Sequence, residues 1–193
     1  MKHSDFILSI YQDKRTVFRL ADIAMLFPEA QVKYLSERMS YYVKTGRLYS
    51  LRRGVYAKPN YNPLELANML FTPSYVSLEY VLQQAGVIFQ YDSRITCISY
   101  LSRDTQIDGK TYSYRRIKEE IVLNPKGVIQ NDAGYSIATA ERAFLDLLYL
   151  NKDFYVDNLM GLNQALIEEL VAVYQSKAVE FRISKLQKNV EQQ

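Results

Sequence analysis

The apolar residues near the start of the chain change their spacing once, at Gly46, and this change restricts the possible fold more than any other feature. Before Gly46 they recur at helical spacing, which predicts three short helices over residues 4–11, 20–27 and 29–45. After Gly46, two β-prone runs flank the turn Arg52-Arg53-Gly54 and predict a β-hairpin with a basic tip. Three helices followed by a hairpin are the element order of a winged helix-turn-helix domain.

The third predicted helix would carry most DNA contacts of such a domain. Its apolar stripe is expected to face the other two helices, which leaves the opposite face for the major groove. The stripe consists of Val32, Leu35, Met39 and Val43. Polar residues early in the helix are placed for base edges, and the arginines of the hairpin suit phosphates or a narrow minor groove. The predicted DNA-binding residues are Gln31, Lys33, Tyr34, Arg38, Tyr41, Lys44, Arg47, Arg52 and Arg53.

Charge divides the chain at residue 58, just after the predicted hairpin. Residues 1–58 carry 11 basic and 5 acidic side chains, whereas residues 59–193 carry 13 and 16. The segment 58–63 holds two prolines and two asparagines and predicts a linker between domains 1–58 and 59–193. A basic head indicates an anionic partner. Two alternatives stay open: the basic residues form only a solvated surface, or the winged helix docks a protein without sequence-specific DNA binding.

The body of the chain, residues 59–193, mixes helical and strand signals. It is predicted to be an α+β domain with a mixed or antiparallel sheet covered by helices. Helices are expected over residues 63–71, 77–84, 139–150, 155–174 and 176–188. Strands are expected over residues 94–100, 111–117, 121–123, 127–129 and 134–137, with a tight turn at Asp108-Gly109.

Most of the residue types that catalytic sites need are scarce. One cysteine, Cys97, and one histidine, His3, exclude an intrachain disulfide and a multi-cysteine or two-histidine zinc motif. The seven glycines form none of the common phosphate-binding motifs. Carboxylates remain available for a metal-dependent nuclease, but their spacing matches no motif, and Arg142 with Asp146 has the spacing of a structural ion pair. We therefore expect no catalytic residues, no metal and no cofactor.

Three blocks of the sequence resemble one bacterial family. Residues 47–56, RLYSLRRGVY, are similar to the wing of the AbiEi-like antitoxins, transcriptional regulators of type IV, abortive-infection toxin–antitoxin operons. Residues 62–67, NPLELA, and 73–82, PSYVSLEYVL, resemble the next stretch of that family, and residues 137–146, IATAERAFLD, resemble a later helix. The blocks keep the family's order over residues 15 to about 150.

The resemblance implies a repressor that binds inverted repeats in double-stranded DNA upstream of its own operon, as a monomer or a dimer. It also implies an antitoxin role for the C-terminal region against a nucleotidyltransferase-like toxin, without a stable complex between the two proteins.

No window reaches the roughly 18 apolar residues of a membrane span, and the N-terminus shows no long apolar run of a signal peptide. The expected location is the cytoplasm, with no membrane contact.

Overall fold

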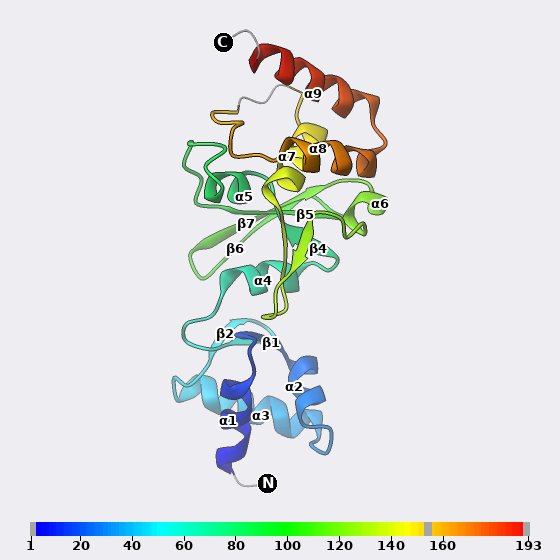
Figure 1. Cartoon of the computed structure of the whole chain (residues 1–193). Helices are drawn as coiled ribbons and strands as arrows, with labels where there is room; N and C mark the ends of the chain where they lie inside the picture. The colour runs from blue at the N-terminus through cyan, green and yellow to red at the C-terminus, as the bar shows by residue number, and fades with distance from the viewer. Residues whose placement is uncertain (1–2, 153–155, 191–193) are drawn as a thin grey trace. The chain divides into compact units, whose positions relative to one another are not determined.

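The chain has a mixed α+β fold made of two compact units. The computed structural model describes residues 3–152 and 156–190 (Figure 1). The N-terminal unit comprises Met1–Leu66 with Asp132–Gly134, and the C-terminal unit comprises Ala67–Asn131 with Tyr135–Gln193. Within the described ranges, no helix is both long enough and apolar enough to cross a membrane.

The N-terminal unit contains the three predicted helices, the predicted hairpin and one additional strand. Its elements are α1 (His3–Gln12), β1 (Val17–Arg19), α2 (Leu20–Leu26), α3 (Val32–Lys44), β2 (Tyr49–Arg52) and β3 (Val55–Ala57). The three strands form an antiparallel sheet in the order β1-β3-β2. Strand β1 was not predicted, because three residues are too few to show a periodicity.

Ten buried side chains from these elements form one core. They are Phe6, Ile10, Phe18, Ile23, Phe27, Leu35, Met39, Tyr42, Leu48 and Tyr56. The predicted stripe of α3 is correct for Leu35 and Met39 and partly correct for Val43, which packs against the core, but it is wrong for Val32. Val32 is 58% exposed and Val43 is only half-buried, whereas Tyr42 is fully buried. Tyr42 lies three residues after Met39 and seven after Leu35, so it shares their side of the helix.

A carboxylate that follows the hairpin in the sequence holds the start of β1. Glu65 lies on α4 (Pro63–Leu70) and is 4% exposed. Its oxygens accept hydrogen bonds from the backbone nitrogens of Thr16 (2.6 Å) and Val17 (3.1 Å) and from the Thr16 hydroxyl (2.8 Å). These bonds satisfy donors at the start of a short strand, where an unpaired buried amide would be costly.

The C-terminal unit is built on a six-stranded mixed sheet. Its strands are β4 (Ser74–Val76), β5 (Ile95–Ser99), β6 (Arg103–Ile107), β7 (Lys110–Arg116), β8 (Val128–Gln130) and β9 (Ser136–Ala138), in the order β6-β7-β5-β4-β9-β8. The β5–β7 and β4–β9 pairs are parallel and the other three are antiparallel. The sheet that the sequence predicted as mixed or antiparallel is therefore mixed.

Helices cover this sheet. They are α5 (Glu79–Gln84), α6 (Glu119–Val122), α7 (Ala140–Leu150), α8 (Gln164–Val171), the 3₁₀ helix η1 (Ala172–Tyr174) and α9 (Lys177–Val190). Helix α7 packs against α5, α8 and α9, and these four helices gather on one side of the sheet in Figure 1. The tight turn predicted at Asp108-Gly109 joins β6 to β7, as expected.

Three predictions for this unit were wrong in part. Residues 121–123 were expected to form a strand, but Ile121 and Val122 end the short helix α6. Ser77 was expected to cap α5, but Leu78 lies at the N-cap with φ 61°, and the Ser77 hydroxyl bonds elsewhere. The helix expected over 155–174 begins at Gln164, and its first predicted residue lies outside the described ranges.

Candidate nucleic-acid interface

One face of helix α3 packs in the core of the N-terminal unit, and the opposite face is exposed to solvent. Leu35, Met39 and Tyr42 lie in the core of the N-terminal unit, each at most 1% exposed. At the C-terminal end of α3, the Tyr42 carbonyl accepts hydrogen bonds from the backbone nitrogens of Arg47 (2.9 Å) and Leu48 (3.2 Å). The chain therefore enters the hairpin directly from α3, and the two elements are held together.

The exposed face of α3 carries most of the predicted DNA-binding residues. Gln31, Lys33, Tyr34, Tyr41 and Lys44 are all exposed. Gln31 lies at the N-cap, but its side chain makes no capping hydrogen bond, so the amide is not used by the helix. A peptide helix with such a polar outer face can lie in the major groove of a duplex, which is wide enough to admit it.

Arg38 departs from this pattern because it is half-buried. Its guanidinium carbon lies 5.8 Å from the ring centre of Tyr34, 5.5 Å from that of Tyr41 and 5.6 Å from that of Tyr42. These are cation–π distances, and three rings around one guanidinium restrict its movement. The Tyr34 ring in turn contacts the Phe6 ring edge-on at 5.8 Å, which connects the cluster to the core.

The hairpin and the connection that precedes it present the remaining predicted residues. Arg47, Arg52 and Arg53 are exposed, and Arg53-Gly54 forms the turn between β2 and β3. Gly54 has φ +75°, a conformation that favours glycine. Its carbonyl accepts a hydrogen bond from the backbone nitrogen of Leu20 (2.9 Å), which ties the turn to the start of α2.

The charges of the N-terminal unit separate into two groups. Arg15 binds the Asp13 carboxylate at 2.8 Å, which raises the pKa of Arg15 and lowers the pKa of Asp13. Lys58 donates to the carbonyls of Asp13 (2.6 Å) and Tyr11 (3.3 Å), and burial lowers the pKa of its amine. Arg15 and Lys58 therefore stabilise the fold through contacts within the N-terminal unit.

The second group of cations lies on α3, in the connection that follows it and on the hairpin. Within residues 3–152 and 156–190, none of its members forms an ion pair with a carboxylate. The members are Lys33, Arg38, Lys44, Arg47, Arg52 and Arg53, and we call them the free cations. A set of unneutralised cations on one helix and the adjoining hairpin is the electrostatic pattern of a polyanion-binding surface.

Two further exposed residues lie among the free cations. Tyr49 on β2 is 48% exposed, and its alternation with the buried Leu48 was the signal that could have placed it on the surface. Glu37 on α3 is also exposed and forms no ion pair within the described ranges. The spacing of Glu37 predicted its outward position but no role for it.

An apolar groove of about 850 Å³ adjoins this surface. Its wall includes Phe6 from α1, Leu26 from α2 and the segment 28–31 that connects α2 to α3. Gln31 and Tyr34 line both the groove and the exposed face of α3. The groove is the feature of the N-terminal unit that favours the alternative of a protein-docking module.

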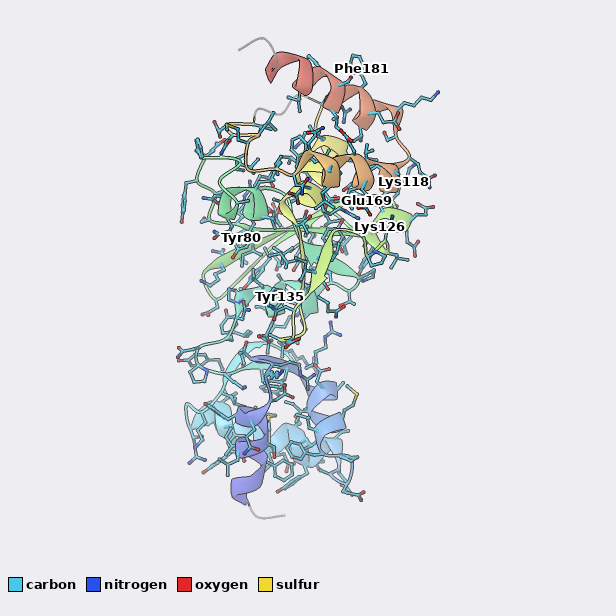
Figure 2. All side chains as sticks on the ribbon, in the orientation of Figure 1. Tyr80, Lys118, Lys126, Tyr135, Glu169 and Phe181 are labelled. Atoms are coloured by element: carbon cyan, nitrogen blue, oxygen red, sulfur yellow. The ribbon has the colours of Figure 1, made fainter. Side chains whose placement is uncertain are left out.

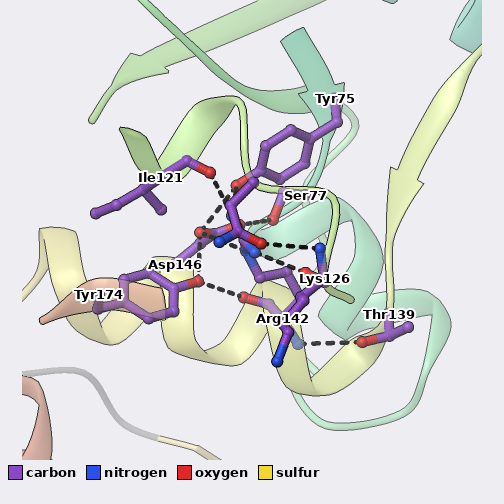
Figure 3. A network of polar contacts seen from close by, with 9 residues as sticks. Tyr75, Ser77, Ile121, Lys126, Thr139, Arg142, Asp146 and Tyr174 are labelled. Carbon is purple, nitrogen blue, oxygen red and sulfur yellow. Dashed lines mark hydrogen bonds and ion pairs between the residues drawn. The ribbon is translucent and has the colours of Figure 1, made fainter. Parts of the chain in front are cut away.

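The C-terminal unit contains a buried polar network, which we considered as a second candidate site. Arg142 and Asp146 are fully buried, and the Arg142 Nε lies 3.4 Å from an Asp146 oxygen (Figure 3). The predicted i, i+4 ion pair is therefore present. Arg142 also donates to the carbonyls of Lys126 (2.6 Å) and Ile121 (2.7 Å).

Hydroxyl groups complete the shell around Asp146. Ser77 (2.7 Å), Tyr174 (2.6 Å) and Tyr75 (3.1 Å) each donate a hydrogen bond to its carboxylate. Burial raises the pKa of the Asp146 carboxyl, while Arg142 and the three hydroxyl donors oppose this shift. Since both charged side chains are sealed from solvent, no substrate reaches them, and the network holds α7 to β4 and η1.

The carboxylates considered for metal chemistry do not converge. In the described ranges, no three His, Cys, Asp or Glu side chains form a group that could hold a metal ion. Asp92 pairs with Arg94 at 2.6 Å, which lowers the pKa of Asp92, and Asp104 accepts a hydrogen bond from Ser113 (2.6 Å). On the surface of the same unit, Lys126 and Glu169 form an exposed ion pair at 3.6 Å (Figure 2).

No family model matches the chain, and no curated protein matches it significantly.

Proposed function

We propose that the N-terminal unit is a winged helix-turn-helix domain and that the chain binds double-stranded DNA through α3 and the β2–β3 hairpin. The observation that carries this proposal is the set of six free cations on those two elements and the short connection between them, beside other cations that are paired within the fold. In this binding mode α3 lies in the major groove, and Arg52 and Arg53 contact the flanking backbone or minor groove.

The resemblance to the AbiEi-like antitoxins adds a biological role to the proposal. The protein would be a non-enzymatic regulator in the cytoplasm that represses its own operon at inverted repeats, as a monomer or a dimer. Its C-terminal unit would supply the antitoxin activity against a nucleotidyltransferase-like toxin, without a stable complex. This second part rests on the resemblance alone, so DNA binding is the part to test first.

The test measures affinity for the DNA upstream of the protein's own gene and for a scrambled duplex, at several salt concentrations. We expect selective binding to the upstream duplex by the unaltered protein. Reversing two hairpin charges, R52E with R53E, should abolish this binding without unfolding the protein, because both side chains are exposed. The matched control, K177E with K185E, makes the same charge change on α9 and should bind as tightly as the unaltered protein.

Three other results would change the conclusion. Equal, weak binding to both duplexes would reduce the free cations to a nonspecific basic surface. Unchanged affinity in the folded double variant would remove the hairpin from the interface. No binding to any duplex at low salt would overturn the proposal and favour a protein partner in the apolar groove described above.

A further inference from the structure

Arg38 differs from the other free cations in how its side chain is held. Lys33, Lys44 and the three hairpin-region arginines are exposed and extend into solvent. The Arg38 guanidinium instead lies within 5.8 Å of three tyrosine ring centres. A phosphate contact does not require such a support, because a mobile lysine or arginine at the surface is sufficient for it.

The cluster also restricts which Arg38 nitrogens can bind a ligand. The Nε atom is buried and has no hydrogen-bond partner within the described ranges. The two Nη atoms are not buried, and no hydrogen bond or ion pair to the described residues occupies them. The guanidinium therefore offers one end, with two parallel N–H donors, at a fixed position on α3.

We propose that Arg38 is a specificity-determining residue that reads a guanine in the major groove; this inference rests on the proposed function. Guanine presents two acceptors there, O6 and N7, which a guanidinium end can bind simultaneously in one plane. Holding the side chain before binding reduces the conformational entropy lost on contact, which benefits a directional contact more than a general electrostatic one. Tyr34 and Tyr41 act as positioning residues that keep the guanidinium in place.

Selection of bound sequences from a pool of randomised duplexes tests the proposal. The unaltered protein, R38K and R38A are compared with K185A, which removes an exposed charge on α9, outside the proposed interface. We expect the unaltered protein and K185A to select guanine at one position of the bound site. R38K keeps the charge but loses the planar fork, so it should lose the preference at that position only, as should R38A.

Affinity measurements on single duplexes make the test quantitative. Replacing the selected guanine should weaken binding by the unaltered protein about 5- to 150-fold, the range for a good bidentate contact, and should leave R38K nearly unaffected. Replacing it by 7-deazaguanine, which lacks only the N7 acceptor, should produce a part of that loss. Thermal unfolding of each variant confirms that the comparison uses folded protein.

A phosphate contact by Arg38 gives a different result and would overturn the proposal. R38A would then weaken binding to every duplex equally and lower the salt slope by about 0.9, while R38K would keep the selected sequence unchanged. An unaltered protein that binds DNA without any guanine preference would also overturn it, although the proposed function would stand. An unaltered protein that binds no duplex would overturn both.

Discussion

At the scale of single residues, Arg142 and Asp146 are a charge pair whose surroundings make its burial tolerable. Two backbone carbonyls and the Tyr75 hydroxyl accept hydrogen bonds from the Arg142 Nη atoms, and three hydroxyl groups donate to Asp146. Taking two charges out of water costs several kcal/mol for each ion unless such contacts replace the lost hydration. The pair is therefore most sensitive to the loss of one partner.

Asp146→Asn should destabilise the protein strongly. The substitution leaves the Arg142 charge buried without a counter-ion, for which a loss of about 3–5 kcal/mol is expected. Urea unfolding at neutral pH measures the change. Glu169→Gln, which breaks the exposed ion pair with Lys126, is the control and should change stability by less than about 1 kcal/mol. Similar effects for the two variants would contradict the structural role of the network.

The contact between Asp13 and Arg15 predicts how the stability of the N-terminal unit changes at low pH. Arg15 lowers the pKa of Asp13 below its ordinary value of 3.8, so the ionised form stabilises the fold. That stabilisation is present above the ordinary value and is lost as the pH falls through the lowered pKa. The Asp13→Asn variant should be less stable than the unaltered protein at neutral pH, and the difference should shrink at about pH 3. Denaturant unfolding at the two pH values measures it; a difference independent of pH would exclude this ionisation as the cause.

At the scale of elements, two turns depend on glycine for different reasons. Gly54 in the hairpin has φ +75°, but a β-carbon there would meet no atom within 4 Å. Gly127 has φ +71°, and a β-carbon there would lie 2.9 Å from the β-carbon of the buried Arg142. The first position is restricted by backbone conformation alone, and the second by conformation and close packing together.

Gly127→Ala should therefore cost more stability than Gly54→Ala. The left-handed conformation of alanine accounts for about 1–2 kcal/mol at each site. The collision with Arg142 adds to this only at Gly127, because α7 would have to move away from the loop. Chemical unfolding of both variants gives the ranking. An equal loss would show that the chain at Gly127 moves aside without cost.

Elements with a distinctive pattern were predictable from the sequence, whereas several short elements were not. Helix α3 and the basic hairpin were predicted because helical spacing, a stop at Gly46 and the Arg-Arg-Gly turn agree with one another. Strand β1 and helix α6 have three and four residues, too few for a period to decide between strand and helix.

The position of a residue in the sequence also did not reveal which long-range partner it has. Ser77 has the side chain and the position of a helix cap, but its hydroxyl binds Asp146, 69 residues later. For the candidate interface, the sequence indicated the exposed residues of α3 and the hairpin. It could not show that three tyrosine rings surround Arg38, because this depends on side-chain conformations along the helix.

At the scale of the whole molecule, the uneven distribution of charge should control binding to DNA. Five free cations remain for phosphates when Arg38 binds a base, so the slope of log affinity against log salt should be no steeper than about −4.5, since each neutralised phosphate contributes about −0.9. Each removal of an exposed cation that contacts a phosphate should reduce the slope by about 0.9. Titrations at four or more salt concentrations measure it, and a slope near zero would exclude an electrostatic interface.

Glu37 should oppose nonspecific binding. Its carboxylate lies on α3 among the free cations, where it repels phosphates. Glu37→Gln should raise the affinity for the scrambled duplex and for the upstream duplex, with the larger effect at low salt because exposed charges are screened. Asp108→Asn, at the β6–β7 turn of the C-terminal unit, is the control and should leave both affinities unchanged. A weaker affinity of Glu37→Gln would show instead that the carboxylate accepts a hydrogen bond from a base.

The contacts of the Glu65 carboxylate determine how short an N-terminal fragment can be made without losing part of its fold. A fragment that ends after the hairpin at residue 58 would contain all the free cations, yet the backbone nitrogens of Thr16 and Val17 would lose their acceptor. A fragment that continues through Leu66 keeps it. For expression of an isolated DNA-binding fragment, the eight residues that follow residue 58, residues 59–66, are thus part of the folded unit, and trimming them would give a poorly folded product.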